Sequence, residues 1–168
     1  NDIQNLSHCG HVITTRTGLG YCYQKSQFFD DAVIDHYRTT TFPVAIHAFA
    51  SISSTNDYAK QFGSSQDFTM PQVFVADTQT QGHGRLGRHF YSPAKGGIYL
   101  SILIPLQNRR TIHSGLITTG TAVCVVRTLQ QFFPDEDFRV KWVNDILVHD
   151  KKCGGILTET ISSLEDGL

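Results

Sequence analysis

The chain has 168 residues, 40% hydrophobic and 17% charged, which is enough for one domain with a buried core and a small appendage. A formal net charge of -1 excludes a strongly basic protein that binds nucleic acid through bulk charge. The sequence contains no apolar run long enough for a membrane span and no signal peptide, and its four cysteines have no C-x-x-C spacing. We therefore expect a cytoplasmic protein with reduced thiols and no membrane partner.

The first half of the chain alternates between strand and helix patterns. Residues 11 to 24 alternate apolar and polar on both sides of TGLG, which predicts a two-stranded hairpin. A helix is predicted next, with Asp30 and Asp31 in its first turn and apolar residues at helical spacing. These apolar residues are Phe28, Phe29, Ala32, Val33 and Tyr37. PVAIHAFA then predicts a strand, and DYAKQF predicts a short helix after the hydroxyl-rich loop SISSTN.

The second half continues with PQVFVAD and GIYLSILIP, both predicted strands. A long helix is predicted over residues 114 to 133. Its expected apolar face consists of Leu116, Val123, Val126, Leu129 and Phe133. RVKW, DILVHD and GGILTE predict three short strands separated by N-D and K-K-C-G turns. The expected fold is α+β, a mixed, mostly antiparallel sheet with helices on one face.

The stretch GHGRLGR, residues 82 to 88, has the G-x-G-x-x-G spacing of a dinucleotide-binding turn. That motif requires a helix directly after the glycines and an acidic residue about 20 positions later. Neither is present, because Pro93, Gly96 and Gly97 interrupt any helix and no acid occurs between Asp77 and Asp135. The sequence therefore argues against a dinucleotide fold.

The same stretch is suited to a different anionic ligand. Six Lys and Arg residues fall in the acid-free interval from Thr78 to Pro134, and Arg85, Arg88 and Lys95 lie in or near the glycine stretch. Glycines allow backbone N–H groups to approach an anion, and guanidinium groups match phosphate and carboxylate oxygens. On these residues alone, a solvated basic turn is an equally good interpretation.

KWVNDILVHDKKCGGILTE supplies a second polar group. Asp145 has the hard oxygen ligands that suit Mg²⁺, Asn144 could orient a phosphate, and Lys152 precedes a glycine pair at a predicted turn. Each also has a structural interpretation, since N-D and K-K are common in solvated turns. Ser54 and Thr55 likewise suit either helix capping or ligand binding.

Taken in order, ADTQTQGHGRLGRHFYSP, GIYLSILIP, VKWVNDILV and KKCGGILTE resemble the catalytic domain of the biotin protein ligases, whose fold is related to class II aminoacyl-tRNA synthetases. GHVITTRTGLGYCY is similar to the wing of the winged helix-turn-helix domain in repressor-type members. The resemblance implies a wing remnant over residues 1–25 and a catalytic domain over 26–168 that is incomplete at its C-terminus.

The resemblance implies an ATP-dependent ligase that forms biotinyl-5′-AMP and transfers biotin to a lysine of the biotin carboxyl carrier protein of acetyl-CoA carboxylase. ATP, Mg²⁺ and biotin are the implied ligands. It assigns biotin binding to Ser54, Thr55, Asn56, Gln79, Gly82, His83, Gly84, Arg85, Ser101, Lys152, Gly155 and Leu157. It assigns the catalytic charges to Arg85, Arg88 and Lys152, the nucleotide to Arg88, Phe90, Lys141, Asn144 and Asp145, and the metal to Asp145.

The chain departs from the family pattern at three positions. Phe90 stands where many relatives have Trp, Val143 replaces the proline of KWPND, and His83 replaces a frequent Arg. The alternatives are a lipoate or octanoyl ligase of the same fold, an inactive fragment, and a biotin operon repressor. The resemblance leaves open a homodimer, and binding to operator DNA by the intact protein only.

Overall fold

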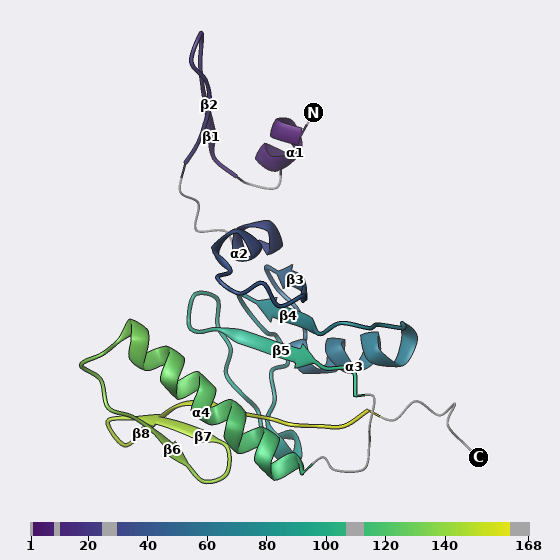
Figure 1. The fold of residues 1–168 in the computed structure, drawn as a ribbon, viewed down its shortest axis with the longest axis vertical. Helices are drawn as coiled ribbons and strands as arrows, with labels where there is room; N and C mark the ends of the chain where they lie inside the picture. Colours follow the sequence, from purple (N-terminus) through teal and green to yellow (C-terminus); the bar gives the residue numbers. More distant parts are fainter. Residues whose placement is uncertain (1, 9–10, 25–29, 107–112, 162–168) are drawn as a thin grey trace.

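The computed structural model describes residues 2–8, 11–24, 30–106 and 113–161 (Figure 1). Its elements are α1 (Asp2–His8), β1 (Ile13–Arg16), β2 (Gly20–Tyr23), α2 (Asp31–Tyr37), β3 (Ala45–Phe49), α3 (Thr55–Ser65), β4 (Gln72–Ala76), the 3-10 turn η1 (Arg85–Gly87), β5 (Tyr99–Leu103), α4 (Ser114–Phe132), β6 (Phe138–Lys141), β7 (Asp145–Val148) and β8 (Lys151–Gly155).

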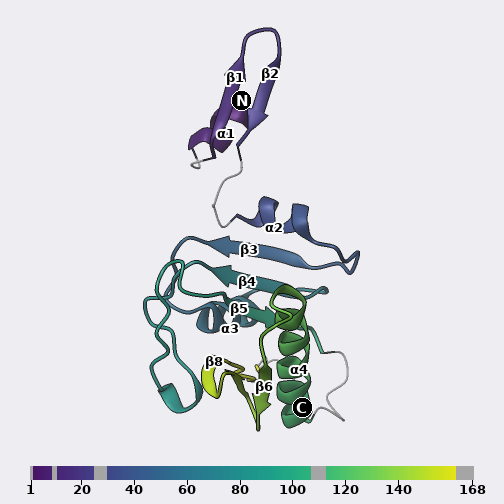
Figure 2. The ribbon, with the colours of Figure 1, turned by 90° about the vertical axis from the view of Figure 1, so that its left-hand side faces the viewer.

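The N-terminal hairpin is confirmed. β1 and β2 pair antiparallel, and Gly18 and Gly20 take the positive φ values of 78° and 87° that the tight turn requires. With α1, which the sequence patterns did not predict, the hairpin stands apart from the main body of the chain (Figures 1 and 2). His11 links the two parts, since its ring lies 2.9 Å from both the Tyr23 hydroxyl and the Asp30 carboxylate. The predicted boundary at residues 25–26 lies outside the described residues.

A three-stranded sheet forms the centre of the main body. β4 pairs parallel with β3 and antiparallel with β5, and α3 packs on β4 and β5. Phe74 of β4 is fully buried, with its ring centroid 4.9 Å from His47, 5.4 Å from Tyr58 and 5.3 Å from Phe62. This aromatic cluster fixes α3 on the sheet, so the positions of the α3 N-terminus and the end of β4 are set together.

β6, β7 and β8 form a second, antiparallel sheet on which α4 packs (Figure 2). The expected apolar face of α4 is largely wrong, because Leu116 and Phe133 are 71% and 53% exposed. The buried stripe is instead Thr118, Ala122 and Val126, at intervals of four residues. Thr118 is tolerated there because its hydroxyl donates to Ser114 O and lies 2.8 Å from Thr158 Oγ1.

The last predicted strand is also displaced along the sequence. K-K-C-G was expected to be a turn and GGILTE a strand, but β8 is Lys151–Gly155. The turn is formed by His149 and Asp150, whose φ values are 47° and 58°. Asp has a short polar side chain that tolerates this left-handed conformation, and an earlier turn places both lysines in the strand.

The structure confirms a mixed, mostly antiparallel α+β fold, with its strands divided between two larger sheets and the hairpin. Within the described residues, no helix has both the length and the apolar character that a membrane crossing requires.

Candidate functional site

The glycine stretch forms a closed loop, which we call the glycine loop (residues 82–88). Its two sides are joined by hydrogen bonds from Gly84 N to Arg88 O and from Phe90 N to Gly82 O, both 2.8 Å long. At the tip, η1 makes a single turn in which Leu86 and Gly87 have φ values of 61° and 69°. No longer helix follows the glycines, as the sequence predicted, so this loop lacks the helix N-terminus of a dinucleotide site.

Gly82 lies at a point of very close packing. A Cβ atom added there would lie 2.6 Å from Ser92 Oγ, 2.8 Å from Phe90 O and 2.9 Å from Gln79 Nε2. These distances leave no room for a side chain, and one of the neighbours is backbone. Gly84 differs, because its nearest neighbour would be Arg88 O at 3.8 Å.

Gln79, just before the glycine loop, connects Thr55 of α3 to Ser92, just after the loop. Its Oε1 accepts from Thr55 N at 2.8 Å and from Thr55 Oγ1 at 3.1 Å, while its Nε2 donates to Ser92 Oγ at 3.0 Å. Ser101 of β5 completes this Gln79 network by donating to Thr55 Oγ1 at 3.0 Å. Thr55 and Ser92 are buried, so three segments far apart in sequence are held by satisfied polar contacts.

Ser92 stands in the motif ADTQTQGHGRLGRHFYSP, but its only signal in the sequence is a hydroxyl directly before Pro93, which indicates no role. Ser54, for which capping and ligand binding were both open, is the N-cap of α3 and accepts from Asp57 N at 3.3 Å.

Replacing Gln79 by leucine should lower the free energy of unfolding by about 1–3 kcal/mol, because Thr55 N–H and the Ser92 hydroxyl lose a partner in a buried setting. Urea denaturation measures this change. Gln81→Leu is the matched control, since Gln81 is exposed and no side-chain hydrogen bond of its own is present in the described part of the chain. Equal losses in the two variants would contradict the role given to the Gln79 network.

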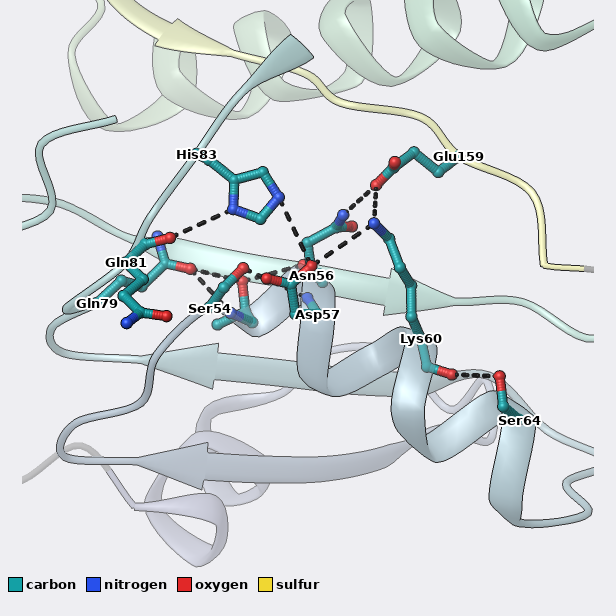
Figure 3. A network of polar contacts seen from close by, with 11 residues as sticks. Ser54, Asn56, Asp57, Lys60, Ser64, Gln79, Gln81, His83 and Glu159 are labelled. Carbon is teal, nitrogen blue, oxygen red and sulfur yellow. Dashed lines mark hydrogen bonds and ion pairs between the residues drawn. The ribbon is translucent and has the colours of Figure 1, made fainter. Parts of the chain in front are cut away.

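A second polar network surrounds the N-terminal half of α3 (Figure 3). Glu159, after β8, accepts from Asn56 Nδ2 and from Lys60 Nζ, the latter at 2.9 Å. Lys60 also lies 3.5 Å from Asp57, whose carboxylate lies 3.6 Å from His83 Nε2 of the glycine loop. We call Asn56, Asp57, Lys60 and Glu159 the α3–Glu159 network. No sequence pattern indicates the contact between Lys60 and Glu159, because it spans 99 positions.

The electrostatics of this network favour its charged form. The hydrogen bond to Glu159 raises the pKa of the Lys60 ammonium, and the hydrogen bond from Lys60 lowers the pKa of the Glu159 carboxyl. Both side chains are 37% exposed, so solvent screens the pair and its net contribution to stability is small.

Acid should remove the contribution of Glu159. A carboxyl whose folded-state pKa is lowered stabilises the fold above its ordinary pKa of 4.5, and the effect is lost as the pH falls through the folded value. We expect Glu159→Gln to lower Tm by about 1–3 °C at neutral pH and by a vanishing amount near pH 3. Calorimetry across pH 3–7 measures this, with Asp67→Asn, an exposed acid outside the network, as control. A pH-independent difference would contradict this assignment.

Arg85 and Arg88 are exposed on the glycine loop, and neither forms an ion pair with any residue that the structure describes. Lys95 is also exposed, and its backbone N–H donates to Asp77 Oδ1 at 3.0 Å. Phe90, at the base of the loop, is 36% exposed. Both guanidinium groups are therefore available to an anionic ligand.

The second sheet holds the remaining predicted residues. Lys152 lies in β8, and its Nζ is 2.6 Å from Oδ1 of Asp145, the first residue of β7. Asn144 uses its side chain structurally, donating to Ile156 O at 3.2 Å, while Ile156 N donates to Asn144 O at 2.8 Å. Lys141 is exposed and lies opposite Asp145 in the β6–β7 register.

Gly155 faces Lys152, whose Nζ would lie 3.4 Å from an added Cβ, and Leu157 is half-buried. In the described part of the chain, no hydrogen bond or ion pair joins Lys152 or Asp145 to the glycine loop. The predicted cations therefore form two groups, one on the loop and one on β8.

Asp145 is a single carboxylate, and the described residues contain no cluster of three or more His, Cys, Asp or Glu side chains that could hold a metal by themselves. This donor set fits Mg²⁺ only as Mg²⁺ is usually bound with nucleotides, through one carboxylate plus substrate phosphates.

Known proteins share this arrangement of elements. The model of the biotin/lipoate A/B protein ligase family matches residues 48–166. The bifunctional ligase/repressor BirA of Salmonella typhimurium is 30% identical over 165 residues, which are 98% of this chain and 49% of that protein. The biotin–[acetyl-CoA-carboxylase] ligase of Mycobacterium tuberculosis is 29% identical over 89 residues, covering 52% of this chain and 34% of that protein.

Two solved structures are similar to the chain. The biotin protein ligase from Aquifex aeolicus in complex with biotin and ATP has a TM-score of 0.57 and 28% identity, over 71% of this chain and 48% of that one. The Leishmania major biotin protein ligase in complex with biotinyl-5-AMP has a TM-score of 0.54 and 26% identity, over 70% and 53%. The chain spans at most about half the length of these relatives. Since the family match extends from β3 to beyond β8, the chain belongs to the biotin/lipoate A/B protein ligase family.

Proposed function

We propose that this chain forms the catalytic part of an ATP-dependent biotin protein ligase. The observation that carries the proposal is the glycine loop, which presents two guanidinium groups without a carboxylate partner among the described residues. The loop packs at Gly82 against Gln79 and Ser92, and Gln79 accepts from Thr55, whose hydroxyl accepts from Ser101. Such a site offers hydroxyl oxygens that can accept from a polar head group, beside cations for a carboxylate and phosphates. The relatives with biotin in their names support this choice of substrate.

In the first step, the biotin carboxylate attacks the α-phosphorus of ATP, and pyrophosphate leaves. In the second, a carrier lysine amine attacks the resulting acyl carbon, and AMP leaves with the bonding electrons. Neither step needs a protein nucleophile, so this chain contributes positioning and charge stabilisation. Arg85 and Arg88 would stabilise negative charge on the acyl phosphate, and Lys152 would do so from β8.

Binding of the acid is assigned to the residues around the glycine loop and the α3 N-terminus. Thr55, Gln79 and Ser101 would bind the polar head group, with Ser54 and Asn56 holding the α3 N-terminus in place. Gly82, His83 and Gly84 would bring the loop backbone close to the acid.

The nucleotide would lie between the loop and the second sheet. Phe90 would stack on adenine, and Lys141, Asn144 and Asp145 would face the phosphates. Gly155 and Leu157 would form the far wall of the biotin site. Mg²⁺, when bound with ATP, would neutralise phosphate charge next to Asp145. In the structure, Lys152 forms an ion pair with Asp145. Its ammonium would therefore have to turn from Asp145 towards the acyl phosphate.

We further infer the partners from the relatives. The substrate protein is a biotin carboxyl carrier protein, and the site of action is the cytoplasm. Residues 1–25, which include α1 and the hairpin, would belong to a winged helix-turn-helix domain, since a repressor-type relative matches over this region. A homodimer and operator DNA would then be partners of the intact protein.

The test is biotin-dependent exchange of radiolabelled pyrophosphate into ATP by the purified protein, with lipoate as the competing acid. We expect exchange with biotin and none with lipoate, because exchange reports adenylate formation without a carrier protein. Exchange with lipoate alone would favour the lipoate branch of the family, and exchange with neither acid in a folded sample would overturn the proposal.

A further inference from the structure

His83 lies on the glycine loop, and its ring is directed at α3 (Figure 3). Nε2 is 3.6 Å from Asp57 Oδ1, and Nδ1 is 3.2 Å from Gln81 O. The His83 side chain is 26% exposed and that of Asp57 is 51% exposed. This contact is a direct side-chain link from the loop to the α3–Glu159 network.

The two ring nitrogens have different requirements. Gln81 O can only accept, so the proton of a neutral His83 ring belongs on Nδ1. Nε2 would then present a lone pair to the Asp57 carboxylate, which is also an acceptor. Only the protonated ring can donate from Nδ1 to Gln81 O and at the same time attract the Asp57 carboxylate as a cation at Nε2. The contact with Asp57 therefore depends on the charge of His83.

Several other charged or titratable groups lie around His83. The charged or titratable groups that face it are Asp57 and Lys60 of α3, Glu159 after β8, and His89 in the backbone bridge across the loop, with Arg85 and Arg88 following on the same loop. Histidine is the side-chain type that changes charge near neutral pH, which leaves His83 and His89 as candidates for a switch. The described structure shows no ion pair for the His89 ring.

We propose that His83 is a positioning residue, whose protonated ring binds Asp57 and holds the glycine loop on the α3 N-terminus. This proposal rests on the proposed ligase function for its consequence: biotin binding should weaken as the pH rises and the contact is lost. The histidine makes loop position pH-dependent, whereas an arginine at the same site would hold its charge throughout.

Loop release can be measured without any ligand by thermolysin, which cleaves before leucine. Leu86 at the loop tip is 86% exposed, and Leu19 in the hairpin turn, 78% exposed, provides a reference bond in the same chain. The ratio of cleavage at Arg85–Leu86 to cleavage at Gly18–Leu19, followed by mass spectrometry, cancels the pH dependence of the protease. We expect this ratio to rise about two- to fivefold between pH 5.5 and 8.5.

Three variants identify the responsible groups. His83→Arg should keep the low ratio at every pH, and Asp57→Asn should give the high ratio at every pH. His89→Gln, the matched control, should reproduce the wild-type profile. A flat wild-type profile, or a profile that changes with His89→Gln but not with His83→Arg, would overturn the proposal.

Calorimetric titration with biotin at pH 6 and pH 8 connects the contact to binding. The affinity of the wild type should fall about two- to fivefold at pH 8, and that of His83→Arg should not change. The biotin carboxylate stays ionised throughout this range and cannot cause the effect. A pH-dependent cleavage ratio with pH-independent biotin affinity would overturn the link to binding. Absence of biotin binding at both pH values would instead overturn the ligase function, while the cleavage profile still tests the His83–Asp57 contact.

Discussion

Replacing Gly82 by alanine should reduce biotin-dependent pyrophosphate exchange about 100-fold, the loss expected when a site is displaced by roughly 1 Å. The added Cβ would lie 2.6 Å from Ser92 Oγ and 2.8 Å from Phe90 O, so the loop must move away from the Gln79 network. Overpacking of this kind also costs about 1–3 kcal/mol of folding free energy. Exchange kinetics and thermal unfolding measure the two effects.

Gly84→Ala is the matched control for stability, because it makes the same change two residues later in the same loop. Its φ of -112° suits any residue, and the nearest atom to the new Cβ is 3.8 Å away. We expect the Tm of this variant to stay within about 1 °C of the wild type. If Gly82→Ala unfolds at the same temperature as Gly84→Ala and exchanges at the wild-type rate, the close packing at Gly82 has no functional consequence.

Replacing Arg85 by glutamine should lower the exchange rate about 10²- to 10³-fold, the usual effect of removing one donor that stabilises developing charge. Arg85 is exposed and has no ion-pair partner within the described residues, so its loss should leave Tm nearly unchanged. A large fall in the exchange rate with an unchanged Tm would indicate that Arg85 binds the ligand and does not stabilise the fold.

Arg127→Gln provides the comparison, since Arg127 is exposed on α4 and outside both networks. It should exchange at the wild-type rate. Lys152→Ala should lose exchange as well, but with some loss of stability, because Asp145 is left without its partner at 2.6 Å. Exchange by Arg85→Gln within threefold of the wild type would remove Arg85 from the catalytic charges.

Local patterns predicted the elements that depend on nearby residues. The hairpin, β3 to β5 and the absence of a helix after the glycines all follow from alternation, β-branched residues and interrupting Pro93 and Gly96. The α4 face could not be predicted in this way, because its stripe contains a threonine whose burial depends on Thr158. Hydrophobicity alone placed the larger side chains Leu116 and Phe133 inside.

The candidate site follows from the sequence only where motif residues mark it, and its ligand-binding roles stay predictions. Gln79, Gly82 and Arg85 stand within one stretch of the sequence. In the structure, Gly82 packs directly against the side chain of Gln79. Lys60 and Glu159 could not be found, since the contact that joins them depends on how the segment after β8 returns to α3. Lys152 was assigned to a turn because K-K pairs usually occupy turns, whereas the turn here is made by His149 and Asp150.

The hydrogen bond between Asn56 and Glu159 joins residues 103 positions apart. A ribosome that adds about 5–20 residues per second needs about 5–20 s to make the chain between them. During that interval β3, β4 and α3 can already pack, since their contacts are close in sequence. The α3–Glu159 network forms only after Glu159 has left the exit tunnel, so in a nascent chain β3, β4 and α3 can pack before the surroundings of the glycine loop are complete.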